Sequence, residues 1–525
     1  MKPGILCSGL ALIVGLSLNC IANATTWPTS GNGRANSRSQ ADESLISPST
    51  VSSLKPIWWI NTSGNVTATP ALDDSYAYFP DSAGFLYKVD RKTGSVIWKK
   101  SVSSYTGISG DYSRTTPAIA GNALILGNQS GKLNGQAARP AQVFAVDKNA
   151  GTLLWNTQVD TTALSMVTQS AIVANGTAFV GVTSNEELVA AFVPPPNWQW
   201  QFRGSVVALD VGTGKIKWQT YTVPPGYYGG AVWGSTGAVD VSRNTVYMAS
   251  GNNYAVPQSV LDCLNKPGTP SACVDPNDHF DSILALDMTT GAIKWSARGL
   301  SYDAWNVGCG LNVPGVFVLP PNGNCPSPQG PDWDFAQGPM LFGSQGKGGN
   351  LVGAGQKSGM FWAFNADTGA VVWSTQVAPG GLTGGLQWGS ANDGSSIYVA
   401  ASNSGLTGSG TTPGVWNLAQ GGTTTSGGWA SVNANTGKVQ WTTADPNGSR
   451  AEAAVSVANG VVFGCNLDPN NGTMYALNAA NGNVLWSYQS GGACNAGPAI
   501  ADGMVFWGSG PTNGTGPLKF FAFGL

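Results

Sequence analysis

The sequence predicts an all-β fold, an eight-bladed β-propeller in which each blade is one small antiparallel sheet. Three observations lead to this prediction. The composition is typical of short strands and tight turns, because 72 of the 525 residues are Gly and 20 are Trp, while charged residues make up only 10%. One motif recurs along most of the chain, and the two ends of the chain together supply a further copy of it.

The recurring motif is [Asp/Asn]-x-x-[Thr/Asn/Ala]-Gly-x-x-x-Trp, preceded by an apolar residue, and it occurs seven times. The copies end at Trp98, Trp155, Trp218, Trp295, Trp373, Trp441 and Trp486. Each copy predicts a hairpin with a first strand, a turn in which Asp or Asn caps its own backbone, a Gly with positive φ, and a second strand ending in Trp. A flat indole on each blade can pack against the next blade, so we expect the Trp residues to form a girdle.

The two chain ends complete the ring. Residues 518–523 resemble the first strand of the hairpin, and residues 54–58 resemble the second. Pairing the two strands would close the ring and remove the free sheet edges that an open array exposes. The sequence therefore predicts eight blades in one domain, residues 25–525.

The N-terminal residues predict export. Lys2 is followed by an apolar run from Ile5 to Leu18 and then by Ala22-Asn23-Ala24, a small-x-small cleavage pattern. Residues 1–24 are therefore predicted to be a signal peptide, and the mature protein to be periplasmic or secreted. A lipid anchor on Cys20 is the less favoured alternative. No later stretch holds 18 uninterrupted apolar residues, so no membrane span is expected.

Cysteine usage agrees with an oxidising compartment. The six Cys residues after the predicted cleavage site fall into the pairs Cys263 with Cys273, Cys309 with Cys325, and Cys465 with Cys494, which we expect to be disulfides. The chain has no CxxC and one histidine, His279, which excludes a c-type haem of its own and a zinc site of the usual Cys/His kind. We interpret His279 as a structural or loop residue. The net charge of −2 offers no basic excess for nucleic acid.

The Asp/Asn-x-x-Thr-Gly-x-x-x-Trp repeat resembles the tryptophan-docking motif of the quinoprotein alcohol dehydrogenases that depend on pyrroloquinoline quinone (PQQ). Residues 113–117, 231–235, 250–252 and 303–306 are most similar to polyvinyl alcohol dehydrogenases and their plant relatives. The resemblance implies bound PQQ and Ca²⁺, a base that removes the alcohol proton, and hydride transfer to the quinone. Because the chain has no haem motif, it also implies an external cytochrome as electron acceptor. The alternative is a non-catalytic scaffold or binding propeller.

The resemblance assigns the metal ligands and the quinone platform residue by residue. Glu187 matches the family's carboxylate ligand for Ca²⁺, with Glu186 as a rival, and Asn252 matches a second ligand that uses its side-chain carbonyl. Trp233 corresponds to the ring that stacks under the quinone, and Trp388 is assigned to the cofactor site with it.

Three further residues are assigned to contacts with PQQ. Arg114 matches the family's salt bridge to a PQQ carboxylate, where a guanidinium binds both oxygens. Thr168 matches a hydroxyl contact to another carboxylate. Lys357 stands where the family has a cation that polarises the reactive quinone oxygen. A scaffold has no reason to keep this set together, so the set favours an enzyme.

The chain departs from the family pattern at the base. No adjacent Cys pair is present, so the family's vicinal disulfide is missing. The family reads Asp-x-Trp-Asp with the last Asp as base, whereas this chain reads Asp303-Ala304-Trp305-Asn306. Asn does not accept a proton at neutral pH. Either Asp303 is the base, or a calcium-bound carboxylate is, or the site is catalytically weak and Asn306→Asp would raise turnover. We favour Asp303.

Overall fold

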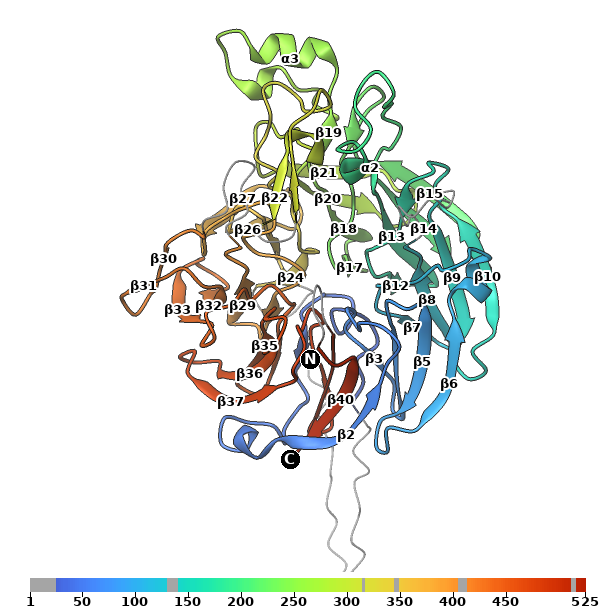
Figure 1. Ribbon diagram of the computed structural model, residues 1–525, viewed down its shortest axis with the longest axis vertical. Coiled ribbons are helices and arrows are strands. Elements are labelled where there is room, and N and C mark those ends of the chain that lie inside the picture. The colour runs from blue at the N-terminus through green and yellow to red at the C-terminus, as the bar shows by residue number, and fades with distance from the viewer. Residues whose placement is uncertain (1–24, 130–139, 314–316, 344–348, 405–412, 511–515) are drawn as a thin grey trace, which may run out of the picture.

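The computed structural model describes residues 25–129, 140–313, 317–343, 349–404, 413–510 and 516–525. Eight blades, each built on four antiparallel strands, are arranged around one axis (Figure 1), which confirms the predicted eight-bladed propeller. The short strand β1 (Ser39–Gln40) adds a parallel strand beside the first strand of blade seven. In each blade the first strand lies innermost and the fourth lies at the rim. The predicted signal peptide, residues 1–24, lies outside the described residues.

The first four blades contain the following strands. Blade one holds β3 (Ala71–Leu72), β4 (Tyr76–Pro80), β5 (Phe85–Asp90) and β6 (Val96–Ser101). Blade two holds β7 (Ala118–Ala120), β8 (Ala123–Gly127), β9 (Gln142–Asp147) and β10 (Leu153–Gln158). Blade three holds β12 (Ile172–Ala174), β13 (Thr177–Ser184), β14 (Ser205–Asp210) and β15 (Ile216–Tyr221), with β11 (Ser165–Met166) also paired to β13. Blade four holds β17 (Ala238–Asp240), β18 (Thr245–Ala249), β20 (Ser282–Asp287) and β21 (Ile293–Arg298).

The other four blades follow the same order. Blade five holds β24 (Met340–Phe342), β25 (Leu351–Gly355), β26 (Met360–Asn365) and β27 (Val371–Gln376). Blade six holds β28 (Ala391–Asn392), β29 (Ser396–Ala401), β32 (Gly428–Asn433) and β33 (Val439–Ala444). Blade seven holds β34 (Ser456–Ala458), β35 (Val461–Cys465), β36 (Thr473–Asn478) and β37 (Val484–Gln489). Blade eight holds β38 (Ala499–Ala501), β39 (Met504–Ser509), β40 (Lys519–Gly524) and β2 (Lys55–Asn61).

Short elements decorate the loops between these strands. Three two-stranded antiparallel sheets pair β16 (Tyr228–Gly229) with β19 (Asn253–Ala255), β22 (Leu311–Val313) with β23 (Phe317–Leu319), and β30 (Trp416–Asn417) with β31 (Thr423–Thr424). The helices are α1 (Ser103–Thr106), α2 (Glu186–Val189) and α3 (Gln258–Leu264), with 3₁₀ turns η1 (Val51–Ser53), η2 (Pro270–Ala272) and η3 (Val307–Cys309). In Figure 1, α3 projects from the rim of the ring. No helix in the described ranges is long and apolar enough to cross a membrane.

Both chain ends form blade eight, as predicted. The N-terminal strand β2 pairs antiparallel with the C-terminal strand β40, and Trp58 lies opposite Ala522. The ring is thus closed by backbone hydrogen bonds between residues that lie more than 400 positions apart in the chain. Without β2, the third strand of blade eight, β40, would have a free edge.

The predicted Trp girdle is present on all eight blades. Each indole Nε1 donates to a backbone carbonyl of the following blade, at 2.8 to 3.3 Å: Trp58 to Arg91, Trp98 to Lys148, Trp155 to Val211, Trp218 to Met288, Trp295 to Ala366, Trp373 to Ala434, Trp441 to Ala479, and Trp486 to Leu54. The motif Gly explains the close fit. Gly94 has a φ of +74°, and a Cβ there would lie 2.7 Å from the ring of Trp58.

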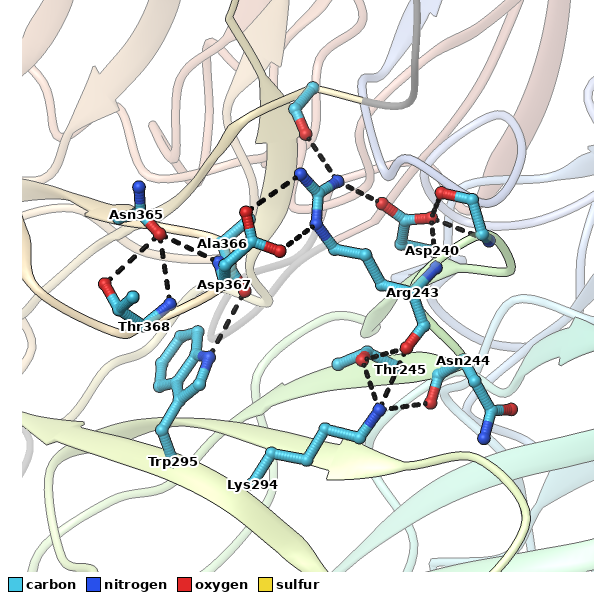
Figure 2. A network of polar contacts seen from close by, with 12 residues as sticks. Asp240, Arg243, Asn244, Thr245, Lys294, Trp295, Asn365, Ala366, Asp367 and Thr368 are labelled. Atoms are coloured by element: carbon cyan, nitrogen blue, oxygen red, sulfur yellow. Dashed lines mark hydrogen bonds and ion pairs between the residues drawn. The ribbon is translucent and has the colours of Figure 1, made fainter.

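Figure 2 shows one of these junctions, between blades four and five. Trp295 donates to Ala366, and Asn365 caps the turn by accepting the N–H groups of Asp367 and Thr368. Arg243 bridges the blades with ion pairs to Asp240 and Asp367, at 2.5 and 2.8 Å. The motif therefore serves both as a hairpin turn and as a receptor for the neighbouring Trp.

Residues 27–40 form a segment that we call the N-terminal belt. It makes hydrogen bonds with the first strands of seven blades, through Leu72, Ile119, Val239, Leu341, Asn392, Val457 and Ile500. Most of these bonds use backbone carbonyls of the belt. Arg38 is buried and donates to the carbonyls of Ser30 and Val455, at 2.6 and 2.7 Å. The belt thus connects the inner strands of most blades.

Three disulfides join Cys263 to Cys273, Cys309 to Cys325, and Cys465 to Cys494. This confirms the predicted pairing. The first lies in the projecting loop of α3, the second in the loop between blades four and five, and the third links β35 to the segment before β38.

Candidate functional site

Loops from blades two to six surround a cavity of about 280 Å³. This volume is near the lower limit for small-ligand sites, about 300 Å³. Seven of the eight predicted site residues line the cavity: Arg114, Thr168, Glu187, Trp233, Asn252, Lys357 and Trp388. They lie far apart in the sequence, and the circular arrangement of the blades brings them together. Asp303 is not among the lining residues.

A buried charge cluster forms one wall of the cavity. The Lys357 ammonium Nζ lies 2.8 Å from Asp332 Oδ1 and 2.9 Å from Asp334 Oδ2, and all three side chains are buried. Burial alone would lower the pKa of Lys357, but Asp332, Asp334 and Glu187 raise it well above its usual value. Lys357 therefore stays charged and sets a fixed positive charge beside the cavity.

Asp334 connects three of the predicted residues. One carboxylate oxygen, Oδ2, accepts from Lys357 and from the indole Nε1 of Trp233 at 3.0 Å. The other, Oδ1, accepts the backbone N–H of Asn252 at 2.6 Å. Neither Asp332 nor Asp334 was predicted from the sequence as a site residue. The available signal was the Trp333-Asp334 pair, an acid directly after a Trp, as in the family's base pattern.

Glu187 and Asn252 present free oxygen atoms to the cavity. The Glu187 carboxylate has no hydrogen bond to any residue that the structure describes, and burial raises its pKa to about 8, although Lys357 opposes this. The rival Glu186 is otherwise occupied, because its carboxylate accepts the backbone N–H groups of Gln201 and Phe202. Asn252 Nδ2 donates to the carbonyls of Asn253 and Trp305, which leaves Oδ1 unpaired within the described chain.

A carboxylate and an amide oxygen are suitable ligands for a hard cation such as Ca²⁺. The described residues contain no group of three or more His, Cys, Asp or Glu side chains placed to hold a metal. Two protein ligands leave much of the coordination of such a cation to other oxygen atoms.

Trp388 has a strained backbone. Its φ of +62° lies in the left-handed region, which is rare for a bulky residue and is concentrated at functional sites. Its ring meets Trp233 edge to face, with centroids 5.4 Å apart and planes at 76°. The Arg114 guanidinium lies over the same ring, 4.4 Å from its centroid. Two aromatic rings and one cation therefore meet at the cavity.

Several polar groups at the cavity have no partner. Arg114 makes no hydrogen bond or ion pair within the described ranges, and the buried atoms Trp388 Nε1 and Gln129 Oε1 are also without one. Thr168 Oγ1 donates only weakly to the Trp233 carbonyl, at 3.3 Å. Buried polar groups are normally hydrogen-bonded. Their convergence on one cavity indicates a polar, anionic ligand.

Asp303 holds a loop in place. It is fully buried, and its two oxygens accept the backbone N–H groups of Asp332 and Trp333, at 3.1 and 2.7 Å. Burial raises its pKa to about 6. Asp303 thus orders the segment that carries Asp334, and its role as the base stays a prediction. Asn306 is also fully buried and does not line the cavity.

The ring and this cavity together define a propeller of the quinoprotein type. A family model described as outer membrane protein assembly factor BamB, and named PQQ_2, matches residues 58–262 and 357–513, and the chain belongs to this family. The predicted relationship to the quinoprotein alcohol dehydrogenases is confirmed by the following comparisons.

Two curated relatives are polyvinylalcohol dehydrogenases. The protein from Sphingopyxis sp. (strain 113P3) is 28% identical over 93% of this chain and 73% of its own length. The protein from Pseudomonas sp. is 27% identical over 92% of this chain and 73% of its own length. Among solved structures, the quinohemoprotein alcohol dehydrogenase from Comamonas testosteroni superimposes with a TM-score of 0.68 at 18% identity, covering 95% of this chain and 80% of that one. That structure shows likeness of fold.

Proposed function

We propose that this protein is a PQQ- and Ca²⁺-dependent alcohol dehydrogenase, with residues 25–525 as its single catalytic domain. One observation carries the proposal. A buried Lys357 that is paired with Asp332 and Asp334, a pair of Trp rings and the unpaired Arg114 meet at one cavity. The named activity of the curated relatives supports the same reaction.

The residues at the cavity fit the cofactor. PQQ is a flat quinone that carries carboxylates, so Arg114 would bind one carboxylate and Thr168 another. Trp233 offers a flat aromatic surface. Glu187 and Asn252 would hold Ca²⁺ with their unpaired oxygens, and the cofactor's own oxygens would complete the coordination. When bound, the quinone supplies the hydride acceptor and Ca²⁺ polarises its carbonyl.

Asp334 is the base that the geometry supports. Among the described residues that line the cavity, Glu187 and Asp334 are the only carboxylates, and Glu187 is assigned to the cation. A general base must reach the proton that it removes, and Asp334 faces the ligand space while Asp303 is turned to the backbone. Asp334 would therefore take the alcohol proton, and Lys357 would stabilise the charges that develop beside it.

The electron acceptor is inferred from the sequence, and the substrate from the relatives. The sequence contains no haem attachment motif, so electrons would pass to a separate cytochrome. The name of the two curated relatives points to bulky or polymeric secondary alcohols such as polyvinyl alcohol. The three disulfides support a periplasmic or secreted location.

A non-catalytic scaffold is the second candidate, because the matching family model carries the name of an assembly factor. A scaffold would explain the ring and the Trp girdle. It gives no reason for a buried Lys357 between two acids or for an unpaired Arg114 at a cavity. The cavity therefore favours the enzyme.

Reconstitution tests the proposal. The purified apoprotein should reduce a dye with secondary alcohols or polyvinyl alcohol only after PQQ and CaCl₂ are added together. Arg114→Gln should weaken PQQ binding at least tenfold. Arg203→Gln is the matched control, because Arg203 lies outside the cavity and donates to the Val223 carbonyl. Failure of the wild-type protein to bind PQQ in the presence of CaCl₂ would contradict the proposal.

A further inference from the structure

Three asparagines outside the cavity form a connected set that we call the amide clamp: Asn306, Asn322 and Asn324. Asn306 Nδ2 donates to the Asn324 carbonyl at 2.8 Å, and Asn322 Oδ1 accepts the Asn324 N–H at 2.9 Å. Asn322 N–H donates to the carbonyl of Gly308 at 2.7 Å. The Cys309–Cys325 disulfide closes the same segment. The clamp is therefore a small, covalently closed unit.

One side of the clamp holds the segment that directly follows α2. Asn324 Nδ2 donates to the carbonyls of Ala190 and Val193, at 2.7 and 2.9 Å, and Asn322 Nδ2 donates to those of Ala190 and Ala191, at 3.0 and 3.1 Å. Because α2 ends at Val189, these bonds fix the chain where it leaves the helix. The short α2 carries Glu187.

The other side of the clamp holds the segment that carries Asn252. Asn306 Nδ2 donates to the Tyr254 carbonyl at 2.9 Å, two residues beyond Asn252. The neighbouring Trp305 also binds this segment through its backbone: its N–H donates to the Asn253 carbonyl, and its carbonyl accepts from the side-chain Nδ2 of Asn252 at 2.8 Å. Thus the clamp touches both segments that present an unpaired oxygen to the cavity.

We propose that the amide clamp positions Glu187 and Asn252 relative to one another, and that Asn306 is retained there as a hydrogen-bond donor. This inference rests on the proposed function, because it takes Glu187 and Asn252 as the cation ligands. Neither Glu187 nor its helix has a direct hydrogen bond to Asn252 within the described chain. The two come from blades three and four, so the elements that contact both segments set their separation.

The chemistry of the position requires an amide. Asn306 uses both N–H donors on carbonyls and its oxygen on the Gly308 N–H at 2.8 Å, and it is fully buried. A carboxylate there would have no donor and would place a negative charge against two carbonyl oxygens. Asn306→Asp should therefore lower cation binding. If Asn306 merely stood in the place of a missing base, Asn306→Asp would instead raise turnover.

The test compares three single Asn→Asp variants for Ca²⁺ and PQQ binding. Asn306→Asp and Asn324→Asp break the clamp. Asn403→Asp is the matched control, because Asn403 is also buried, donates to two carbonyls and accepts one backbone N–H, yet lies outside the cavity. CaCl₂ titrated into apoprotein with PQQ, followed by quenching of Trp fluorescence, gives the affinity, and thermal unfolding gives the stability.

We expect both clamp variants to lose at least tenfold in Ca²⁺ affinity relative to Asn403→Asp at a comparable loss of melting temperature. Excess CaCl₂ should restore most of their turnover, because the clamp does not touch the reacting groups. Clamp variants that bind Ca²⁺ and PQQ as tightly as the control would overturn the inference while leaving the proposed function intact. A wild-type protein that binds neither ligand would overturn both.

Hydrogen exchange of the wild-type protein decides the matter if the clamp variants do not fold. Binding of Ca²⁺ and PQQ should slow amide exchange in residues 306–313 and 317–325, although none of these residues lines the cavity. Unchanged exchange in that segment, with slower exchange at the cavity itself, would overturn the inference.

Discussion

At the scale of single residues, the acids behind the cavity divide into two tasks. Asp334 lines the cavity and accepts from Lys357, Trp233 and the Asn252 N–H. Asp303 does not line the cavity, and its two oxygens accept two backbone N–H groups. Asp334→Asn should lower turnover by roughly 10²–10⁴, the usual contribution of a general base. The measurement is dye reduction by a secondary alcohol at saturating PQQ and CaCl₂.

Asp303→Asn is the paired variant. An amide accepts with only one oxygen, so it would release one of the two N–H groups that hold the Asp332 segment. We expect a lower melting temperature and a smaller loss of turnover than in Asp334→Asn. If Asp303→Asn loses more turnover than Asp334→Asn, Asp303 is the base, as favoured from the sequence.

The sequence could predict most of the candidate site but not Asp332 and Asp334. Seven residues chosen by resemblance line one cavity, although they lie outside the copies of the repeated motif. Asp334 lies in a long connection between β21 and β24 that follows no periodicity. Only the folded backbone decides which of the two Asp-containing stretches, at 303 or at 334, faces the ligand space. The spacing of the first stretch favoured Asp303, which does not line the cavity.

The interpretation of His279 as a structural residue can be tested directly, because it is the one histidine of the chain. Its Nδ1 lies 2.8 Å from Ser296 Oγ, and burial, assisted by Arg298, lowers its pKa to about 4. The neutral form is favoured in the fold. The stability that it contributes is therefore fully present above the ordinary pKa of about 6.5 and is lost as the pH falls toward 4.

The single imidazole signal in an NMR titration should move with a midpoint near pH 4. His279→Gln should flatten the decline in melting temperature between about pH 6.5 and pH 4. A midpoint at the ordinary value would show that His279 is solvated and has no part in acid unfolding.

At the scale of elements, the Trp dock explains why the motif contains Gly. Gly94 has a positive φ and also lies where a Cβ would meet the Trp58 ring at 2.7 Å. Gly121 has a similar φ of +62°, but a Cβ there would have no neighbour within 4 Å. The two positions therefore separate backbone strain from overpacking.

Gly121→Ala should cost about 1 kcal/mol in the free energy of unfolding, from strain alone. Gly94→Ala should cost about 1–3 kcal/mol more, because the added methyl displaces the docked indole. Thermal or denaturant unfolding of the two variants provides the comparison, and equal losses would mean that the dock has no steric demand for Gly.

The elements of the ring were predictable, whereas the N-terminal belt was not. The hairpin motif fixes strand, turn and docking residue in each blade, and apolar strand-like ends indicated closure through β2 and β40. The belt binds the blades mainly through backbone carbonyls, so its side chains carry no alternating pattern. The sequence of residues 27–40 therefore gave no sign of a separate structural element.

At the scale of the whole molecule, two devices oppose the opening of the ring. Blade eight is built from both chain ends, and the belt joins the inner strands of seven blades. The belt also contributes Ser30 and Arg38 to a small cavity beside Arg114 and Trp388. Residues 27–40 therefore link the stability of the ring to the residues that border the cofactor region.

Arg38 is the residue through which this coupling can be measured. Its guanidinium donates to the carbonyls of Ser30 and Val455 and to the hydroxyls of Thr69 and Ser456, and burial lowers its pKa to about 9. Arg38→Met would retain the length of the side chain but leave these buried acceptors unpaired. We expect a loss of about 3 kcal/mol or more in the free energy of unfolding.

Arg34→Met is the control within the same belt. Arg34 contributes its backbone carbonyl to Val239, and this bond survives the substitution, so the loss should stay within about 0.5 kcal/mol. Denaturant unfolding with and without PQQ and CaCl₂ measures both variants. Because the belt borders the cofactor region, the ligands should stabilise Arg38→Met less than the wild-type protein. Equal free energies of unfolding for the two variants would show that the belt contacts the blades without stabilising the closed ring.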